Sequence, residues 1–278
     1  MSSLDLKLSD PIGLSLSDKT LDVLRDFLQP KTALTLKSNA RSILDLLPEK
    51  GPLSSDIWLV GDVCFELAVQ IPYYHPSQLK LAALLEYLGK STQLGQILAS
   101  KDMITGQYHW FQVLEGSLRR LTDSQPDPED PSEHINSHAF AANLFERRIF
   151  TTDILWAIWA LRDAHENPQD EKGRIRDGHV SAAAQWILWY GQSFFKHVLF
   201  PGEVSSDDLR SWSPGPLYHG EAHLSLHRWH FWRGRFSAVV SGKTGWEKWY
   251  SQECKTLAAK AAEMMDSLEK NMTFEDSD

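Results

Sequence analysis

The segment GPLYHGEAHLSLHRWHFWRGRF, residues 215–236, holds side chains that could bind a charged or planar ligand. Arginines alternate there with aromatic residues, and a guanidinium can lie over an aromatic ring or pair with an acid. Prolines and glycines precede the start of a helix near residues 224–226, where backbone N–H groups are free. We therefore predict a ligand or partner site formed by Tyr218, His219, Arg228, Trp229 and Arg235.

A purely structural role suits the same residues. Tyr218 and Trp229 would then fasten the loop to the core, while the arginines would pair with acids elsewhere in the chain. A ligand role for Arg228 predicts that Arg228→Ala leaves the melting temperature nearly unchanged and weakens binding. Unfolding of that variant would contradict the site.

Four histidines in the segment, His219, His223, His227 and His230, raise the question of a metal site. Zinc needs convergent nitrogen ligands at about 2.0–2.1 Å, and a spacing of four places two imidazoles on one helix face. The helix is expected to begin after the first two histidines, and no HExxH motif accompanies them. We predict no metal and no cofactor. Catalytic residues stay unassigned, because hydrolase, phosphate-loop and dinucleotide motifs are absent too.

Two polar stripes interrupt otherwise apolar helices. They comprise Asp62, Glu66 and Gln70 in one helix, and Ser181, Gln185, Gln192 and Lys196 in another. The close carboxylates of the first stripe would suit acid–base chemistry, and they equally suit ion pairs with a basic residue of a neighbouring helix. The sequence leaves open whether either stripe faces a pocket or solvent.

Helices must position these groups, because no segment alternates with a period of two. The pattern predicts an all-α fold, an irregular bundle of about nine to eleven helices around a buried, Trp-rich central helix. That helix, residues 180–200, is apolar on nearly every side and must be buried with Trp186 and Trp189. The other expected helices span residues 17–30, 32–47, 54–70, 79–88, 108–121, 139–145, 151–166, 226–236 and 246–268.

Composition and charge limit the function classes. We expect an irregular N-terminal arm (1–16), one helical domain (17–270) with a solvated acidic loop (123–133), and a disordered acidic tail (271–278). The formal charge of −9 argues against nucleic acid and anionic membranes as partners. Cys64 and Cys254 are expected to be reduced, buried thiols, which indicates the cytoplasm, with the nucleus as the alternative.

The 215–236 segment, together with residues 58–88, HAFAANL (138–144) and AAAQWILWYG (182–191), resembles a fungal family of unknown function. The resemblance spans roughly residues 55–240. It implies a single all-helical domain, and some family members are found near secondary-metabolite gene clusters. An Asn-Ala-Phe segment of the family corresponds to His138-Ala139-Phe140 here, and the family has an arginine near Asn143.

Two functions remain open, and no motif names a reaction. The first is binding, or conversion without a cofactor, of a small hydrophobic or acidic molecule in an aromatic-lined pocket. The second is a protein-interaction or scaffold role that uses an Arg/Trp surface. A pocket of roughly 300–1,000 Å³ would favour the first function, and an exposed aromatic patch would favour the second. The oligomeric state is left undetermined.

Overall fold

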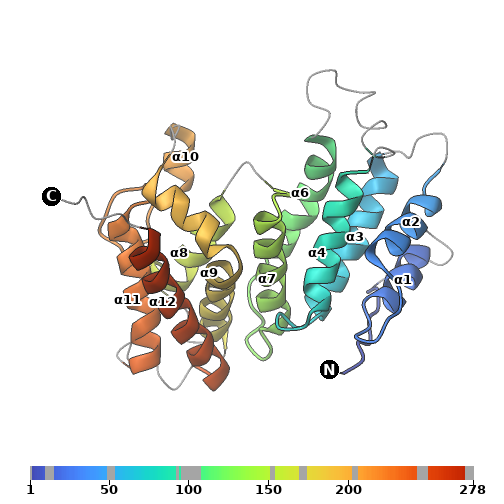
Figure 1. The fold of residues 1–278 in the computed structure, drawn as a ribbon. Coiled ribbons are helices and arrows are strands. Elements are labelled where there is room, and N and C mark those ends of the chain that lie inside the picture. The colour runs from blue at the N-terminus through green and yellow to red at the C-terminus, as the bar shows by residue number, and fades with distance from the viewer. Residues whose placement is uncertain are drawn as a thin grey trace. The chain divides into compact units, whose positions relative to one another are not determined.

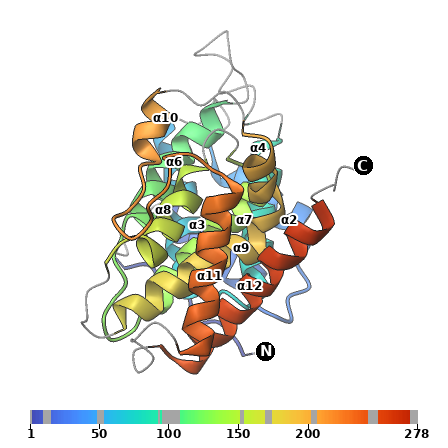
Figure 2. The same ribbon diagram turned by 90° about the vertical axis from the view of Figure 1, so that its left-hand side faces the viewer.

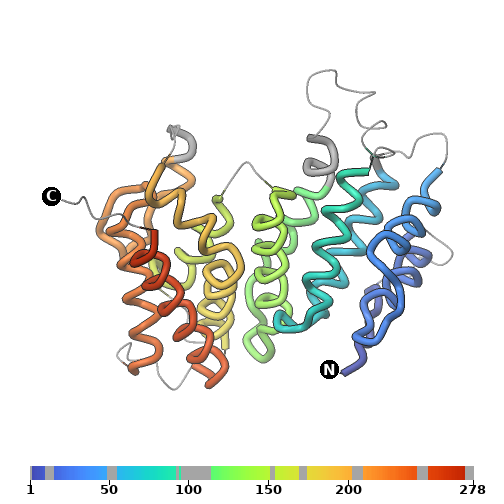
Figure 3. The backbone as a smooth tube through the Cα atoms, in the orientation of Figure 1, coloured from blue at the N-terminus to red at the C-terminus, as the bar shows by residue number. Residues whose placement is uncertain are grey.

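The computed structural model describes residues 2–9, 16–48, 54–91, 94, 108–150, 154–168, 174–201, 206–242 and 250–272. Within these ranges the chain forms eleven α-helices and no strand, which confirms the predicted all-α class (Figure 1). The backbone divides into two compact units, residues 1–124 with 143–151 and residues 125–142 with 152–278 (Figure 3).

The first unit is organised around α3. Its helices are α1 (Leu16–Phe27), α2 (Leu36–Leu46), α3 (Ser54–Gln70), α4 (Ser77–Gly89) and α6 (Tyr108–Thr122). Helix α3 contacts α1, α4 and α6, so it is covered on several sides. At the contact with α6, a Cβ added to Gly61 would overlap the side chain of Leu114, so a glycine permits this close approach.

The second unit is organised around α9. Its helices are α8 (Leu155–His165), α9 (Ile175–Leu199), α10 (Ser206–Ser211), α11 (Leu226–Ser241) and α12 (Gln252–Met272), with residues 132–142 of α7 (Ser132–Glu146). Helix α9 contacts α8, α11 and α12, and α11 lies beside α12 (Figure 2). The long apolar helix is therefore the centre of this unit.

The burial of α9 follows the prediction, with one exception. Trp186 is only 1% exposed, and Phe194 and Phe195 are buried as well. Trp189 was expected in the core but is only half-buried. Its indole N–H donates to Gln185 Oε1 at 3.1 Å. A tryptophan at the edge of a helix interface keeps its polar nitrogen close to a partner.

Helix α9 also begins at Ile175, five residues before the predicted start. This first turn is polar, yet Asp177 is buried there. Its carboxylate accepts hydrogen bonds from the backbone N–H and the hydroxyl of Ser251, at 2.8 and 3.1 Å. A polar side chain can be buried when it has hydrogen-bond partners of this kind. Because these partners come from another segment, the periodicity of one helix does not reveal them.

The acidic loop carries its acids in solvent, but two of its prolines are buried. A Cβ added to Gly178 of α9 would lie 2.6 Å from Cβ of Pro126 and 2.8 Å from Cβ of Pro131. The glycine therefore lets both prolines rest against α9. Helix α7 follows directly and begins at Ser132, seven residues earlier than predicted.

Both cysteines are free and buried, as expected. Burial raises the pKa of Cys64 to about 12 and also raises the pKa of Cys254. The predicted caps Thr151 and Thr152, the expected helix residues Trp246 and Trp249, and the acidic tail from Thr273 lie outside the described residues. None of the described helices has the length and hydrophobicity that a membrane crossing requires.

Candidate functional site

The start of α11 is built around a buried ion pair. The Nε and Nη2 atoms of Arg228 donate to the two oxygens of Glu166, at 2.7 and 2.9 Å, and both side chains are 0% exposed. The carboxylate also accepts from Trp232 Nε1 at 2.8 Å and from the Gly215 backbone N–H at 2.9 Å. Arg228 Nη1 donates to the Trp212 carbonyl at 2.9 Å. Each carboxylate oxygen thus has two donors, as a buried charge requires.

The loop before α11 packs against the backbone of Glu166. The Leu217 N–H donates to the carbonyl oxygen of Glu166 at 2.8 Å. A Cβ on Gly215 would lie 2.6 Å from that oxygen, so only glycine permits this approach. The hydroxyl of Tyr218 lies 2.8 Å from His227 Nδ1, and burial raises the pKa of this tyrosine. The loop is therefore held to the rest of the second unit by hydrogen bonds and close packing.

The predicted site residues are only partly brought together. The Arg228 guanidinium lies 5.5 Å from the ring centre of Tyr218, and Tyr218 is buried, while His219 is exposed. Arg228 makes its described hydrogen bonds to Glu166 and to the Trp212 carbonyl, and such an ion pair is what the structural alternative for this arginine predicts.

The remaining two predicted residues face other parts of the unit. Trp229 is fully buried, and its ring centre lies 4.6 Å from that of Phe195 on α9. Arg235 is half-buried; burial lowers the pKa of His165, and the charge of Arg235 lowers it further. A ligand role for the five residues stays a prediction, since no contact described here tests it.

Three of the four histidines of this segment have separate described partners. His223 Nδ1 lies 3.1 Å from Glu221, and His230 Nε2 lies 2.7 Å from Glu269 on α12. His227 contacts the tyrosine of the loop, as described above. In the part of the chain that the structure describes, no group of three or more His, Cys, Asp or Glu side chains could hold a metal ion.

The carboxylates of the α3 stripe do not form a pair with each other. Asp62 accepts hydrogen bonds from Arg120 and, at 3.1 Å, from the Ser117 hydroxyl, both on α6. Glu66 instead accepts the backbone N–H of Ser9. The ion-pair alternative is thus confirmed for Asp62, and the described hydrogen bonds of Asp62 and Glu66 go to different partners.

The α9 stripe runs from the interior to the surface. Ser181 and Gln185 are buried, whereas Gln192 and Lys196 are exposed. Neighbouring helices pack at an angle to α9, so they can cover one end of the stripe and leave the other end in solvent. Its exposed end leads to the groove described below.

A buried histidine cluster escaped the sequence analysis. Trp186 Nε1 donates to Nδ1 of His138 at 2.9 Å, and the His138 ring centre lies 4.5 Å from that of His134. His179 lies 5.3 Å from His134. Burial lowers the pKa of His138 to about 3 and that of His179 to about 4, so these imidazoles are neutral at pH 7. The four-residue spacing of His134 and His138 was the available signal.

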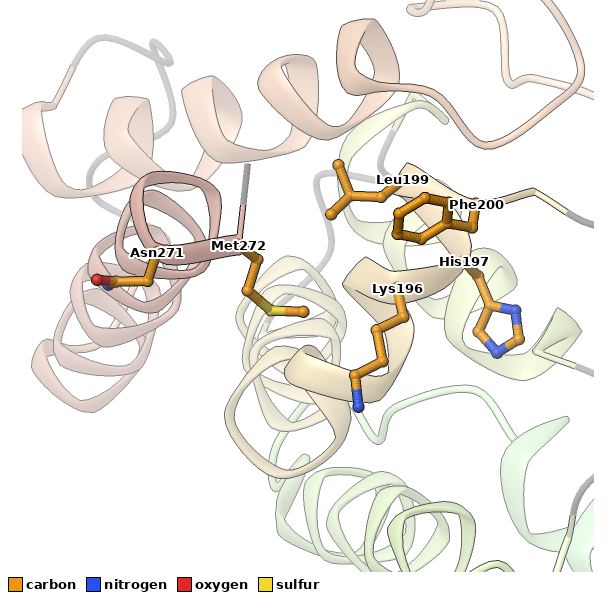
Figure 4. A pocket seen from close by; sticks show the side chains of 6 residues that line it. All are labelled: Lys196, His197, Leu199, Phe200, Asn271 and Met272. Atoms are coloured by element: carbon orange, nitrogen blue, oxygen red, sulfur yellow. The ribbon is translucent and has the colours of Figure 1, made fainter. Parts of the chain in front are cut away.

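A groove lies between the C-terminal ends of α9 and α12. Its volume is about 450 Å³, and its lining residues are Lys196, His197, Leu199, Phe200, Asn271 and Met272. Figure 4 shows Lys196, His197 and Leu199 on the last turn of α9, with Phe200 directly after it, and the other two side chains at the end of α12. The exposed fraction of Phe200 is 76%, the largest among the exposed large hydrophobic residues described.

Comparison with known proteins places the chain in a family. The sequence pattern of the family described as "Protein of unknown function (DUF3632)" matches residues 62–236, more than half of the 278 residues. The chain belongs to the DUF3632 family. No curated protein and no solved structure matches it.

The DUF3632 region contains the ion pair of Glu166 and Arg228 and the histidine cluster. It also contains the α9 side of the groove, whereas Asn271 and Met272 lie beyond it. Residues 2–9, whose contact with Glu66 was described above, precede it. The groove therefore combines residues of the DUF3632 region with residues of the C-terminal helix.

Proposed function

We propose that this protein binds a small, hydrophobic and largely uncharged molecule in the groove between α9 and α12. The observation that carries the proposal is the groove itself, about 450 Å³ with Leu199, Phe200 and Met272 in its lining. That volume lies within the roughly 300–1,000 Å³ of small-molecule sites. An occupant would also cover the exposed ring of Phe200, and removal of apolar surface from water favours binding.

The charges at the groove favour an uncharged ligand. Each helix C-terminus carries roughly half a negative charge, and α9 and α12 both end here, at Leu199 and Met272. Together these ends offset about one positive charge, which is that of Lys196. Partial desolvation lowers the pKa of His197, which disfavours a charged imidazole there. Apolar contact, rather than charge, is therefore the main source of affinity.

The lining supports binding rather than chemistry. The six side chains include one imidazole and one amine but no carboxylate, hydroxyl or thiol. General acid–base catalysis needs groups positioned around the reacting atoms, and the imidazole and the amine here belong to exposed side chains with no partner that would position them among the described contacts. The resemblance to fungal proteins near secondary-metabolite genes supports a secondary metabolite as the ligand class.

Titration with a neutral solvatochromic dye tests the proposal. We expect saturable 1:1 binding to the natural protein and about tenfold weaker binding to Phe200→Ser, because covering a phenylalanine contributes about 1.5–3 kcal/mol. Tyr74→Ser is the matched control, since Tyr74 is 69% exposed but lies in the first unit. Equal affinity of the Phe200→Ser variant and the natural protein would contradict the site.

A second substitution tests the charge argument. Lys196→Ala should change the affinity for the neutral dye by less than about twofold, because the ammonium makes no ion pair with it. A long-chain carboxylate serves as the charged probe. If it binds more tightly than the dye and loses about fivefold or more in Lys196→Ala, the ligand is acidic, because one charge pair in water is worth about 1 kcal/mol at 4 Å.

Phe200 also favours a second candidate, a protein partner that inserts an apolar side chain into the groove. The interaction surface expected on α11 would have used tryptophans, but Trp229 and Trp232 are buried there. The ends of α9 and α12 are the better place for such a contact. This candidate would be supported over the first if the natural protein binds no dye but forms a complex with a protein partner, and if the Phe200→Ser variant does not form that complex.

A further inference from the structure

Residues 2–9 form an extended arm on the first unit, at the end of the chain marked N in Figure 3. Leu6 is buried, and Leu4 and Leu8 are half-buried, whereas the residues between them are exposed. This alternation is the period of two of a β-strand, whose side chains point to opposite faces in turn. The arm therefore presents one leucine face to the helices below it.

Two glutamine side chains hold the arm by its backbone. Gln29, just after α1, accepts from the N–H of Leu4 and donates to its carbonyl, both at 3.0 Å. Gln70, at the end of α3, accepts from the N–H of Lys7 at 3.0 Å and donates to its carbonyl at 2.7 Å. Each amide thus pairs with both backbone groups of one residue, as a neighbouring antiparallel strand does.

The pattern of these bonds shows that the arm is held along both edges. In an extended chain the backbone groups of residues i and i+2 face one edge, and those of residue i+3 face the other. Leu4 and Leu6 face α1, where Arg25 donates to the Leu6 carbonyl at 3.4 Å. Lys7 and Ser9 face α3, where the second carboxylate of the α3 stripe accepts the Ser9 N–H. The arm thus lies in a seat, the arm site, formed by Arg25, Gln29, Glu66 and Gln70.

The arm site recognises an extended backbone with a leucine at its centre. The four side chains that form it all bond to backbone groups of the arm, and Gln29 Oε1 also accepts from the Ser3 hydroxyl at 2.8 Å. Most of the recognition is therefore of the backbone. The salt bridge of Asp5 with Lys7, 2.6 Å long, leaves the arm without net charge of its own. The segment that meets these requirements is present in every copy of the chain.

We propose that the arm can be exchanged between copies of this protein, so that residues 2–9 of one copy occupy the arm site of another. Every bond made within one copy can be repeated between two copies, which is the basis of domain swapping. Within one copy the arm competes at an effective concentration of about millimolar, because the connection to α1 is short. Exchange should therefore become visible when the arm of one partner is disabled.

Two complementary variants test the exchange. Leu6→Asp leaves the arm site intact but removes the buried anchor of the arm. Gln29→Ala/Gln70→Ala leaves the arm intact but removes both amides of the arm site. Each variant alone should be monomeric, and a mixture should form a 1:1 heterodimer in size-exclusion chromatography with light scattering. A mixture that stays as two folded monomers up to about millimolar concentration would overturn the proposal.

A labelled peptide of residues 2–9 provides a second measurement. It should bind the Leu6→Asp protein at least about tenfold more tightly than the natural protein, whose own arm competes for the site. The same peptide with Leu6→Asp should bind neither protein. If the Leu6→Asp chain fails to fold by circular dichroism, Leu6→Ala takes its place in both experiments. Absence of peptide binding to a folded chain with a disabled arm would equally contradict the exchange.

Discussion

Two regions of the second unit differ in how far other parts of the protein pair with or cover their side chains. Arg228 and Glu166, at the start of α11 and the end of α8, are 0% exposed and neutralise each other. At the end of α9, Phe200 is 76% exposed beside a groove of about 450 Å³. Arg228, which the sequence placed in a ligand site, is paired with Glu166 inside the protein, whereas the ring of Phe200 has apolar surface left to cover.

The difference follows from the cost of burial. A charge taken out of water must find a partner inside the protein, since an unpaired buried ion costs several kcal/mol. An exposed phenylalanine costs far less, and single exposed apolar residues are common. A residue type alone therefore does not mark a binding site. A groove lined by apolar side chains that are partly exposed is a better indication of a binding site.

The sharpest test of this comparison is Arg228→Ala. It leaves the Glu166 carboxylate buried without its cation, and we expect a loss of about 3–5 kcal/mol in the free energy of unfolding, measured by urea denaturation. The ligand site predicted from the sequence requires nearly unchanged melting instead. Arg233→Ala is the control, because Arg233 is a partly exposed arginine of α11 bonded to Asp266 and Glu269, and its loss should cost less than about 1 kcal/mol.

Trp186→Ala tests the core against which both regions rest. The indole is 1% exposed and donates to His138, so its removal should cost about 3–5 kcal/mol in urea melts. The half-buried Trp189 supplies the comparison on the same helix and should cost less when changed to alanine. A loss below about 1 kcal/mol for Trp186→Ala would mean that α9 is not the centre of the unit.

Acid pH should weaken the second unit through its buried histidines. The folded pKa values of His138, His165 and His179 are about 3, about 3 and about 4, below the ordinary 6.5. The unfolded chain therefore binds more protons as the pH falls below 6.5. Stability is complete above that pH and declines toward pH 4, by about 1 kcal/mol per histidine at pH 5.5. Urea melts between pH 7.5 and 5 measure the decline.

His138→Asn identifies one contribution to this decline. An asparagine keeps an acceptor for the Trp186 indole N–H but does not titrate in this range. We expect it to remove up to about a third of the loss between pH 7.5 and 5.5, since His138 is one of the three histidines with the largest shifts. An unchanged pH dependence would show that His138 is protonated equally in the folded and unfolded chains.

The smallest expected effect on stability belongs to Phe200→Ser. Because the ring is mostly in water, the free energy of unfolding should change by less than about 0.5 kcal/mol. Binding of the neutral dye should weaken about tenfold in the same variant, as set out above. A large loss of stability would show that Phe200 belongs to the core and that the groove is a packing defect.

The helical class and the central helix followed from the sequence because hydrophobic periodicity is a local property. Residues 180–200 have too narrow a polar stripe for a surface helix, and the structure buries Trp186 and Phe194 as that pattern requires. Helix ends were less predictable. Asp177 in the first turn of α9 and His138 of α7 are polar and buried, and their partners come from segments distant in the sequence.

The fold class, the burial of α9 and the buried state of both cysteines could be predicted from the amino-acid sequence. Which polar residues meet depends on how the helices pack. Glu166 is 62 residues from Arg228, and no local pattern links them. The groove joins residues 196–200 with Asn271 and Met272 for the same reason. Periodicity shows which face of a helix is covered, but the identity of the covering side chains depends on which helices pack together.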